Sequence, residues 1–191
     1  AKVIAMSDSS GYIIDENGIN LDVMKEIKEV RRGRISEYAK SVKGSVFHKD
    51  GRIWNTPCDI ALPCATQNEL NKEDAETLIK NGVIAVCEGA NMPTTPDAID
   101  VLMQNHILFA PGKASNAGGV ATSALEMSQN SLRLSWTAEE VDARLKDIME
   151  NIYKTVSETA KEYDAPDNFM VGANIAGFIK VADSMIEQGI V

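Results

Sequence analysis

Four short segments are rich in small and hydrogen-bonding residues, and each follows a short apolar run. They comprise residues 7–11, 63–69, 88–93 and 110–120. Small side chains let backbone amides approach a bound molecule, and hydroxyl and amide groups can read the edges of a ribose or a carboxamide. Turn formation alone also enriches Gly, Asn, Ser and Pro after strands, so one such segment would indicate little. Four at equivalent positions indicate a binding edge for a nucleotide.

The elements that must position these segments alternate between strand and helix. Apolar runs predict buried strands at residues 2–6, 59–62, 83–87 and 107–109. Helical spacing predicts helices that follow Asn20, Asn71 and Thr95. Strands that are apolar on both sides are typical of a parallel sheet covered by helices on both faces. The sequence therefore predicts an α/β fold with a doubly wound, Rossmann-like parallel sheet, which binds ligands at the carboxyl ends of its strands.

The remainder of the chain is predicted to be helical. Thr137 and Glu140 have the spacing of a capping box, and a last helix is expected from about Asn168 to Gly189. We therefore expect one domain over residues 1–191, with a sheet portion at 1–120 and a helical portion at 121–191.

A turn signal at residues 49–52 lies between short apolar runs within residues 44–54. Such a signal predicts a small β-hairpin at this place. No function is assigned to it.

Composition excludes several classes of protein. The 191 residues carry a net charge of -9, which opposes binding to nucleic acid because that binding depends on Lys and Arg. The longest uninterrupted apolar runs are short, so we expect no membrane partner and a cytoplasmic location. The three cysteines, Cys58, Cys64 and Cys87, lack the spacing of metal ligands. We expect no metal site and buried, reduced thiols.

Several long strings of the sequence resemble one family. They are Pro-Cys-Ala-Thr-Gln-Asn-Glu at 63–69, Glu-Gly-Ala-Asn-Met-Pro-Thr-Thr at 88–95, Ala-Pro-Gly-Lys-Ala-Ser-Asn-Ala-Gly-Gly-Val at 110–120 and Asn-Ile-Ala-Gly-Phe at 174–178. Together they resemble the coenzyme domain of the small-subunit hexameric NAD(P)-dependent glutamate dehydrogenases. The resemblance runs along the whole chain. It implies reversible oxidative deamination of L-glutamate to 2-oxoglutarate and ammonium, in a homohexameric enzyme.

The resemblance also implies roles for individual residues. Ser123 would hydrogen-bond the side-chain carboxylate of glutamate, and Val120 would line the same pocket. A hydroxyl near a helix N-terminus suits an anionic ligand, which makes this role of Ser123 physically reasonable. Four further residues would contact the coenzyme: Asn91 and Asn116 at the nicotinamide end, and Ala65 and Thr66 at the adenosine part.

Two arguments disagree about the coenzyme. Asp8 ends a predicted strand, where an acidic residue usually accepts hydrogen bonds from the ribose 2′-hydroxyl of NAD. The segment at 7–11, however, resembles the form found in NADP-using members of the family. There the hydroxyls of Ser7 and Ser9 would bind the 2′-phosphate together with cations from elsewhere in the protein. We expect NADP to be preferred, with NAD possible.

Parts of the enzyme are expected to lie outside this chain. No G-x-G-x-x-G turn for the pyrophosphate occurs in it, and the family's catalytic lysines and aspartate belong to an upstream, N-terminal catalytic domain. We therefore assign no catalytic residue here, expect the sheet to be incomplete at its N-terminus, and expect the isolated chain to be inactive. Two alternatives are a related branched-chain or aromatic amino-acid dehydrogenase domain and a non-catalytic nucleotide-binding module.

Overall fold

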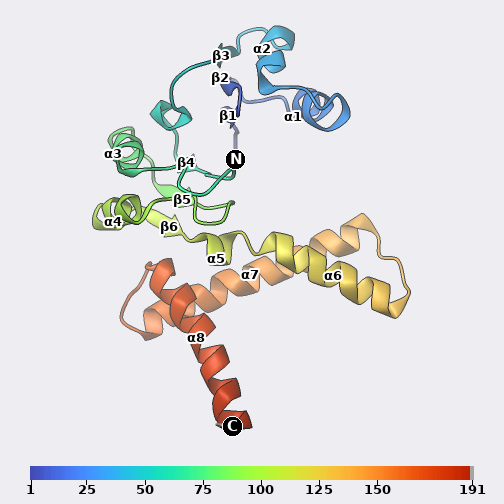
Figure 1. The fold of residues 1–191 in the computed structure, drawn as a ribbon, viewed down its shortest axis with the longest axis vertical. Helices are drawn as coiled ribbons and strands as arrows, with labels where there is room; N and C mark the ends of the chain where they lie inside the picture. Colours follow the sequence, from blue (N-terminus) through green and yellow to red (C-terminus); the bar gives the residue numbers. More distant parts are fainter. Residues whose placement is uncertain (190–191) are drawn as a thin grey trace.

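The computed structural model describes residues 1–189, which form two β-sheets and a group of long helices. Figure 1 shows the antiparallel sheet and its helices at one end, the parallel sheet in the middle and α5 to α8 at the other end. Each sheet has its own apolar core. The three parts are therefore stacked along the long axis of the molecule.

The N-terminal part is a three-stranded antiparallel sheet. β1 (Ala5–Asp8) pairs with β2 (Gly11–Ile14), which pairs with β3 (Val46–His48). The segment between β2 and β3 contains α1 (Leu21–Lys25), the π-helical turn η1 (Glu26–Val30), the 3-10 helix η2 (Ile35–Glu37) and α2 (Tyr38–Ser41). As expected, the side chain of Asn20 caps the first of these, since it accepts hydrogen bonds from the N–H groups of Asp22 and Val23 at 3.1 and 3.2 Å.

The expectation that the first strand is a buried member of the parallel sheet is wrong. β1 instead turns back at Ser9 and Ser10 to pair with β2. Gly11 has φ of +140°, and a Cβ there would lie 2.2 Å from the carbonyl oxygen of His48, so only glycine allows the return strand at this place. Ile13 is buried, Ser7 and Val46 are exposed, and the other strand residues are half-buried, because one face of this sheet packs on its helices and the other is open.

The prediction of a β-hairpin within residues 44–54 is also wrong. β3 pairs with β2, and the residues after the turn form the 3-10 helix η3 (Ile53–Asn55). This connection leads from the antiparallel sheet to the parallel one, and η3 packs on both β1 and α3. The apolar residues before this connection therefore pack in the core of the antiparallel sheet, and those after it pack in the core of the parallel sheet.

The parallel sheet confirms the predicted α/β class. Its strands β4 (Ile60–Ala61), β5 (Ala85–Cys87) and β6 (Leu108–Ala110) lie in chain order and are joined through α3 (Lys72–Lys80) and α4 (Pro96–Gln104). Each element lies where the sequence places it, although β4 and β5 are shorter than predicted and β6 begins one residue later. Asn71 caps α3 by accepting a hydrogen bond from the N–H of Asp74 at 3.0 Å.

Within residues 1–189, helices cover one face of this sheet more fully than the other. Ala61, Val86 and Phe109 lie in register and are buried together with residues of both α3 and α4. On the opposite face, Ile60 and Leu108 remain 48% and 44% exposed. The reason is topological, because crossovers of the same hand between strands added in one direction place their helices on the same side.

The helical part follows the parallel sheet. It consists of α5 (Gly112–Ser115), α6 (Gly118–Leu132), α7 (Ala138–Glu162) and α8 (Phe169–Gln188). The predicted capping box is present, since Thr137 and Glu140 exchange hydrogen bonds of 2.8 and 3.2 Å. α7 and α8 cross closely at Gly172, where a Cβ would lie 2.2 Å from the carbonyl oxygen of Val156.

α8 is the one described helix that is long and apolar enough to cross a membrane, with 20 residues and a mean hydropathy of 1.3. We expected no membrane partner because the uninterrupted apolar runs in the sequence are short. α8 qualifies that expectation, since its apolar residues are separated by polar ones and still give the helix a high mean hydropathy. Only 6% of the most apolar 18-residue stretch of this helix is buried. Its second half extends away from the rest of the molecule in Figure 1, and Phe178, Val181 and Met185 are exposed there. Length and hydropathy of a single helix are weak evidence for a membrane span, since a helix that packs on other protein passes the same test.

Candidate nucleotide-binding site

Two of the predicted binding segments meet beyond the carboxyl ends of β4 and β5. They enclose an open pocket of about 480 Å³, lined by Cys64, Ala65, Thr66, Gln67, Gly89, Ala90 and Asn91. The segments are joined by backbone hydrogen bonds from the N–H groups of Gly89 and Ala90 to the carbonyl oxygen of Pro63, at 2.9 and 3.2 Å. The structure thus brings together three of the residues expected to contact the coenzyme: Ala65, Thr66 and Asn91.

The pocket depends on close contact between these segments. A Cβ on Gly89 would lie 2.5 Å from the sulfur of Cys64, so a larger residue would push the two loops apart. Cys64 is exposed in the pocket, which corrects the expectation that all three thiols are buried; Cys58 and Cys87 are half-buried. Partial desolvation by the surrounding loops raises the pKa of the Cys64 thiol, and the carboxylate of Glu69 raises it further, while the N–H of Gly89 opposes the shift.

A third segment joins the pocket through two asparagines. The side-chain amide of Asn116 donates to the side-chain oxygen of Asn91 at 2.6 Å and to the carbonyl oxygen of Ala90 at 3.3 Å. Asn116 lies at the end of α5, which follows β6. The two residues predicted to face the nicotinamide end are therefore in contact, although they are 25 residues apart.

A buried carboxylate that sequence reasoning missed holds these segments in place. Glu88 follows β5 and is 5% exposed. Its two oxygens accept hydrogen bonds from the N–H of Gly112 at 2.6 Å and from the N–H of Thr94 at 3.2 Å. The hydroxyl of Ser115 donates to its carbonyl oxygen at 2.6 Å. The available signal was its position, since an acidic residue directly after an apolar strand is placed at the ligand edge of the sheet.

The fourth predicted segment lies in the β1–β2 hairpin and lines a second pocket of about 280 Å³. Its walls include Ser7, Asp8, Tyr12, Arg52, Trp54 and Asn68. The segment therefore lies beside the loop that follows β4, with η3 and the residues before it completing the wall. Ser9 is exposed at the tip of the hairpin.

Both oxygens of Asp8 are occupied by hydrogen bonds within the protein. Oδ1 accepts from the N–H and the hydroxyl of Ser10 at 2.8 and 2.6 Å. Oδ2 accepts from the N–H of Ile35 at 2.9 Å and from the ammonium group of Lys28 at 3.0 Å. Burial raises the pKa of Asp8, but the hydrogen bonds from Ser10, Ile35 and Lys28 outweigh it and hold the pKa well below its usual range.

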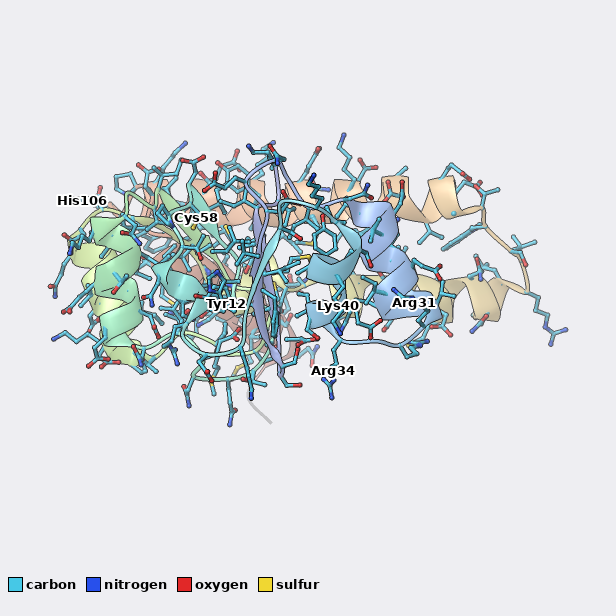
Figure 2. The ribbon with its side chains drawn as sticks, turned by 90° about the horizontal axis from the view of Figure 1, so that it is seen from above. Tyr12, Arg31, Arg34, Lys40, Cys58 and His106 are labelled. Carbon is cyan, nitrogen blue, oxygen red and sulfur yellow. The ribbon has the colours of Figure 1, made fainter. Side chains whose placement is uncertain are left out.

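A cation that the sequence analysis expected only in general terms lies at the same loop. The guanidinium of Arg34 donates to the hydroxyl of Ser9 at 2.7 Å. Figure 2 shows Arg34 projecting outward from the antiparallel part of the molecule. Because Arg34 and Ser9 are 25 residues apart, no local pattern pointed to their contact. Together with Lys28 it gives this loop two positive groups.

The two residues expected at the substrate lie on α6. Val120 is 71% exposed, and Ser123 is exposed one turn later on the same face. The hydroxyl of Ser123 makes no hydrogen bond within residues 1–189. The helix begins at Gly118, so Ser123 is its sixth residue. The helix N-terminus therefore does not support its proposed role, because the free N–H groups belong to the first four residues.

Within the described residues 1–189, no group of three or more His, Cys, Asp or Glu side chains could hold a metal ion. The chemistry that these loops offer is hydrogen bonding by amides, hydroxyls and backbone groups, with cations at one end. A parallel sheet with such loops at the carboxyl ends of its strands is typical of nucleotide-binding α/β domains of the Rossmann type.

Comparisons with known proteins agree with this class and identify the family. Residues 1–189 match the model of the glutamate/leucine/phenylalanine/valine dehydrogenase family, so the chain belongs to that family. It is 54% identical to the glutamate dehydrogenase of Bacteroides thetaiotaomicron over 193 residues, which cover all of this chain and 43% of that protein. It is also 54% identical to the NADP-specific glutamate dehydrogenase of Escherichia coli, over 194 residues that likewise cover 43% of that protein.

A solved structure confirms the fold. The glutamate dehydrogenase of Plasmodium falciparum superposes with a TM-score of 0.94 at 47% identity, covering all of this chain and 42% of the other. This chain therefore spans less than half the length of the relatives it matches.

Proposed function

We propose that this chain is the coenzyme-binding part of an NADP-preferring glutamate dehydrogenase, which catalyses the reversible oxidative deamination of L-glutamate to 2-oxoglutarate and ammonium. The observation that carries the coenzyme assignment is the contact between Arg34 and Ser9 beside a fully occupied Asp8. The substrate assignment is supported by the relatives of 54% identity, which are named glutamate dehydrogenases.

The geometry of Asp8 supports the second of the two coenzyme arguments, the one for NADP. A carboxylate that ends a strand signals NAD when its oxygens are free to accept from the ribose 2′-hydroxyl. In this chain those oxygens already accept from Ser10, Ile35 and Lys28, so the carboxylate supports the loop instead. An arginine nearby is the group that accommodates a 2′-phosphate, and Arg34 meets that requirement.

The remaining site residues have matching roles in this proposal. Bound NADP supplies the acceptor for the hydride that leaves the substrate α-carbon. Asn91 and Asn116, already in contact, orient the carboxamide end, and Ala65 and Thr66 leave room for the adenosine part. Ser123 and Val120 form one wall of the glutamate pocket from the exposed face of α6.

Catalytic groups come from outside this chain. We place the lysines and the aspartate that act on the substrate in a preceding N-terminal catalytic domain of a homohexameric, cytoplasmic enzyme. The glycine-rich pyrophosphate turn belongs to the part of the coenzyme-binding domain that precedes this chain. The isolated chain is then inactive, and turnover of glutamate by carefully purified 191-residue material would contradict this.

The proposal is tested on the full-length protein that contains this chain. NADP-dependent oxidation is measured with glutamate, leucine, phenylalanine and valine, and we expect glutamate to be used best. Replacing Arg34 by Met removes a charge-assisted contact, so the KM for NADP should rise by roughly ten- to a hundredfold while the KM for NAD changes little.

Lys40→Met is the matched control, since Lys40 is another exposed cation of the same part of the molecule (Figure 2). It should leave both KM values unchanged. A preference for leucine, or an equal effect of Arg34→Met on NADP and NAD, would overturn the assignment.

A further inference from the structure

Arg52 connects the antiparallel part of the molecule to the loops of the parallel sheet. It lies between β3 and η3, outside every segment that the sequence marked for function. Its Nε donates to Oδ1 of Asp74 at 2.6 Å, and its Nη2 donates to Oδ2 of the same carboxylate. The same Nη2 donates to the carbonyl oxygen of Glu69 at 2.6 Å.

The partner of this guanidinium cannot move freely. Asp74 is 4% exposed and belongs to the first turn of α3. Its carboxylate also accepts from the N–H of Asn71 at 3.0 Å, which closes the capping box of that helix. The fork of an arginine fits a carboxylate at two points and fixes its own orientation, which a lysine cannot do. Arg52 is thus held rigidly against the start of α3.

The contact to Glu69 transmits this rigidity to the coenzyme loop. The carbonyl oxygen of Glu69 accepts from Arg52 and, at 3.3 Å, from the indole N–H of Trp54. The side-chain carboxylate of Glu69 accepts from the N–H of Ala65 at 2.9 Å and so closes the loop that follows β4. Hydrogen bonds therefore run from Arg52 through Glu69 to Ala65, which lines the larger pocket.

We propose that Arg52 is a positioning residue for the coenzyme: through Glu69 it fixes the Ala65–Thr66 loop at the distance from the Ser7–Ser9 hairpin that the adenosine part of NADP requires. This rests on the proposed function, because both loops are coenzyme-binding only within it. Arg52 lines the smaller pocket together with Asp8 of the hairpin and Asn68 of the loop that follows β4, so it borders the space between the two loops.

The first measurement concerns the loop itself, without coenzyme. Amide hydrogen exchange at Ala65 should become faster in Glu69→Ala, which removes the acceptor, and in Arg52→Met, which frees the residue that carries it. Glu69→Gln keeps an amide oxygen in place and should restore most of the protection. An unchanged exchange rate at Ala65 in both Arg52→Met and Glu69→Ala would overturn the proposal, whatever the catalytic activity of these variants.

The second measurement is NADP binding to the full-length protein by calorimetry, with the KM values for NADP and glutamate. Arg52→Met and Glu69→Ala should each weaken NADP binding roughly tenfold, equivalent to about 1.4 kcal/mol, and leave the KM for glutamate unchanged. Since they act through one network, the double variant should be little worse than either single one.

Tm measurements and two further variants, Arg52→Lys and Lys146→Met, distinguish a positioning role from a general loss of stability. Arg52→Met leaves a buried carboxylate without its cation and should also lower Tm, whereas Glu69→Ala leaves that pair intact. Arg52→Lys should recover part of the affinity, and Lys146→Met, which removes an exposed cation of α7, should change nothing. Additive effects in the double variant, or a KM for glutamate that rises with that for NADP, would refute the role of Arg52. A wild-type protein that binds no NADP would instead refute the proposed function.

Discussion

Replacing Glu88 by Gln tests whether a buried carboxylate organises the nicotinamide end of the site. Glu88 accepts one backbone N–H at each oxygen, from Gly112 at 2.6 Å and from Thr94 at 3.2 Å. Glutamine offers one oxygen and one NH₂ group, so one of the two backbone donors must face another donor. A hydrogen bond to a charged group contributes about 1.5–3 kcal/mol, and a buried unpaired donor costs about 1–3 kcal/mol.

Removal of the buried charge offsets part of this loss, because a carboxylate is costly to desolvate. We therefore expect a net destabilisation of about 2 kcal/mol, which for a chain of this size lowers Tm by roughly 4–8 °C. Thermal unfolding of the 191-residue chain, with the exposed Glu126→Gln as control, provides the measurement. An unchanged or raised Tm in Glu88→Gln would show that desolvation dominates and that the two hydrogen bonds do not hold the loops.

Three further predictions concern the other parts of the site. Ser123→Ala in the full-length enzyme should lower kcat/KM for glutamate roughly ten- to a hundredfold and leave NADP affinity unchanged. It should also reduce the preference for glutamate over norvaline. An unchanged ratio of kcat/KM for glutamate to that for norvaline would show that Ser123 does not line the pocket. The folded pKa of Asp8 is depressed below its usual 3.8, so its stabilisation is present above that pH and is lost as the pH falls through the folded value. The stability gap between wild type and Asp8→Asn, measured by urea unfolding, should therefore be full at pH 7 and shrink below about pH 4; a gap that widens on acidification would contradict this. Because the pKa of Cys64 is raised, iodoacetamide should label this exposed thiol slowly at pH 7 and faster above about pH 9, and Glu69→Gln should speed the reaction. Mass spectrometry can follow the labelling, and a rate at pH 7 equal to that of a free thiol would contradict the shift.

Features that depend on neighbouring residues were predictable from the sequence. Asn20, Asn71 and Asn168 cap the helices that follow them, because a short polar side chain reaches the free N–H groups two or three residues later. The loops after β4, β5 and β6 also lie where the alternation of strand and helix places them. Their meeting in one pocket follows from the geometry of a parallel sheet.

The pairing partner of the first strand was predicted wrongly, although it is local in the sequence. Lys2 to Met6 is apolar enough for a buried parallel strand, yet the strand pairs antiparallel with the Gly-Tyr-Ile-Ile segment that follows the turn. The segment at 11–14 carried the missed signal, since a Ser-Ser-Gly turn between two short apolar runs is typical of a hairpin. Hydrophobicity alone indicates that a strand is buried, and it does not indicate the partner.

Two charged residues of the site were missed because their partners are distant in the sequence. Arg34 and Arg52 act on groups at least 17 residues away along the chain. An isolated charged residue is exposed in most proteins, so composition gives it no special status. Only the fold shows that these two side chains border the proposed coenzyme loops.

These charged groups explain how loops built from small residues can be rigid. Residues such as Ala65 and Gly112 have almost no side chain of their own to pack, which lets a ligand approach but leaves the loop without support. In each loop a carboxylate supplies that support by accepting backbone N–H groups: Asp8 from Ser10 and Ile35, Glu69 from Ala65, and Glu88 from Gly112 and Thr94. Glu88 is buried behind the loops that it supports, whereas Asp8 and Glu69 support their loops from the wall of the smaller pocket. Substitutions at these three positions should therefore weaken coenzyme binding through loop mobility, without removing a contact to the coenzyme itself.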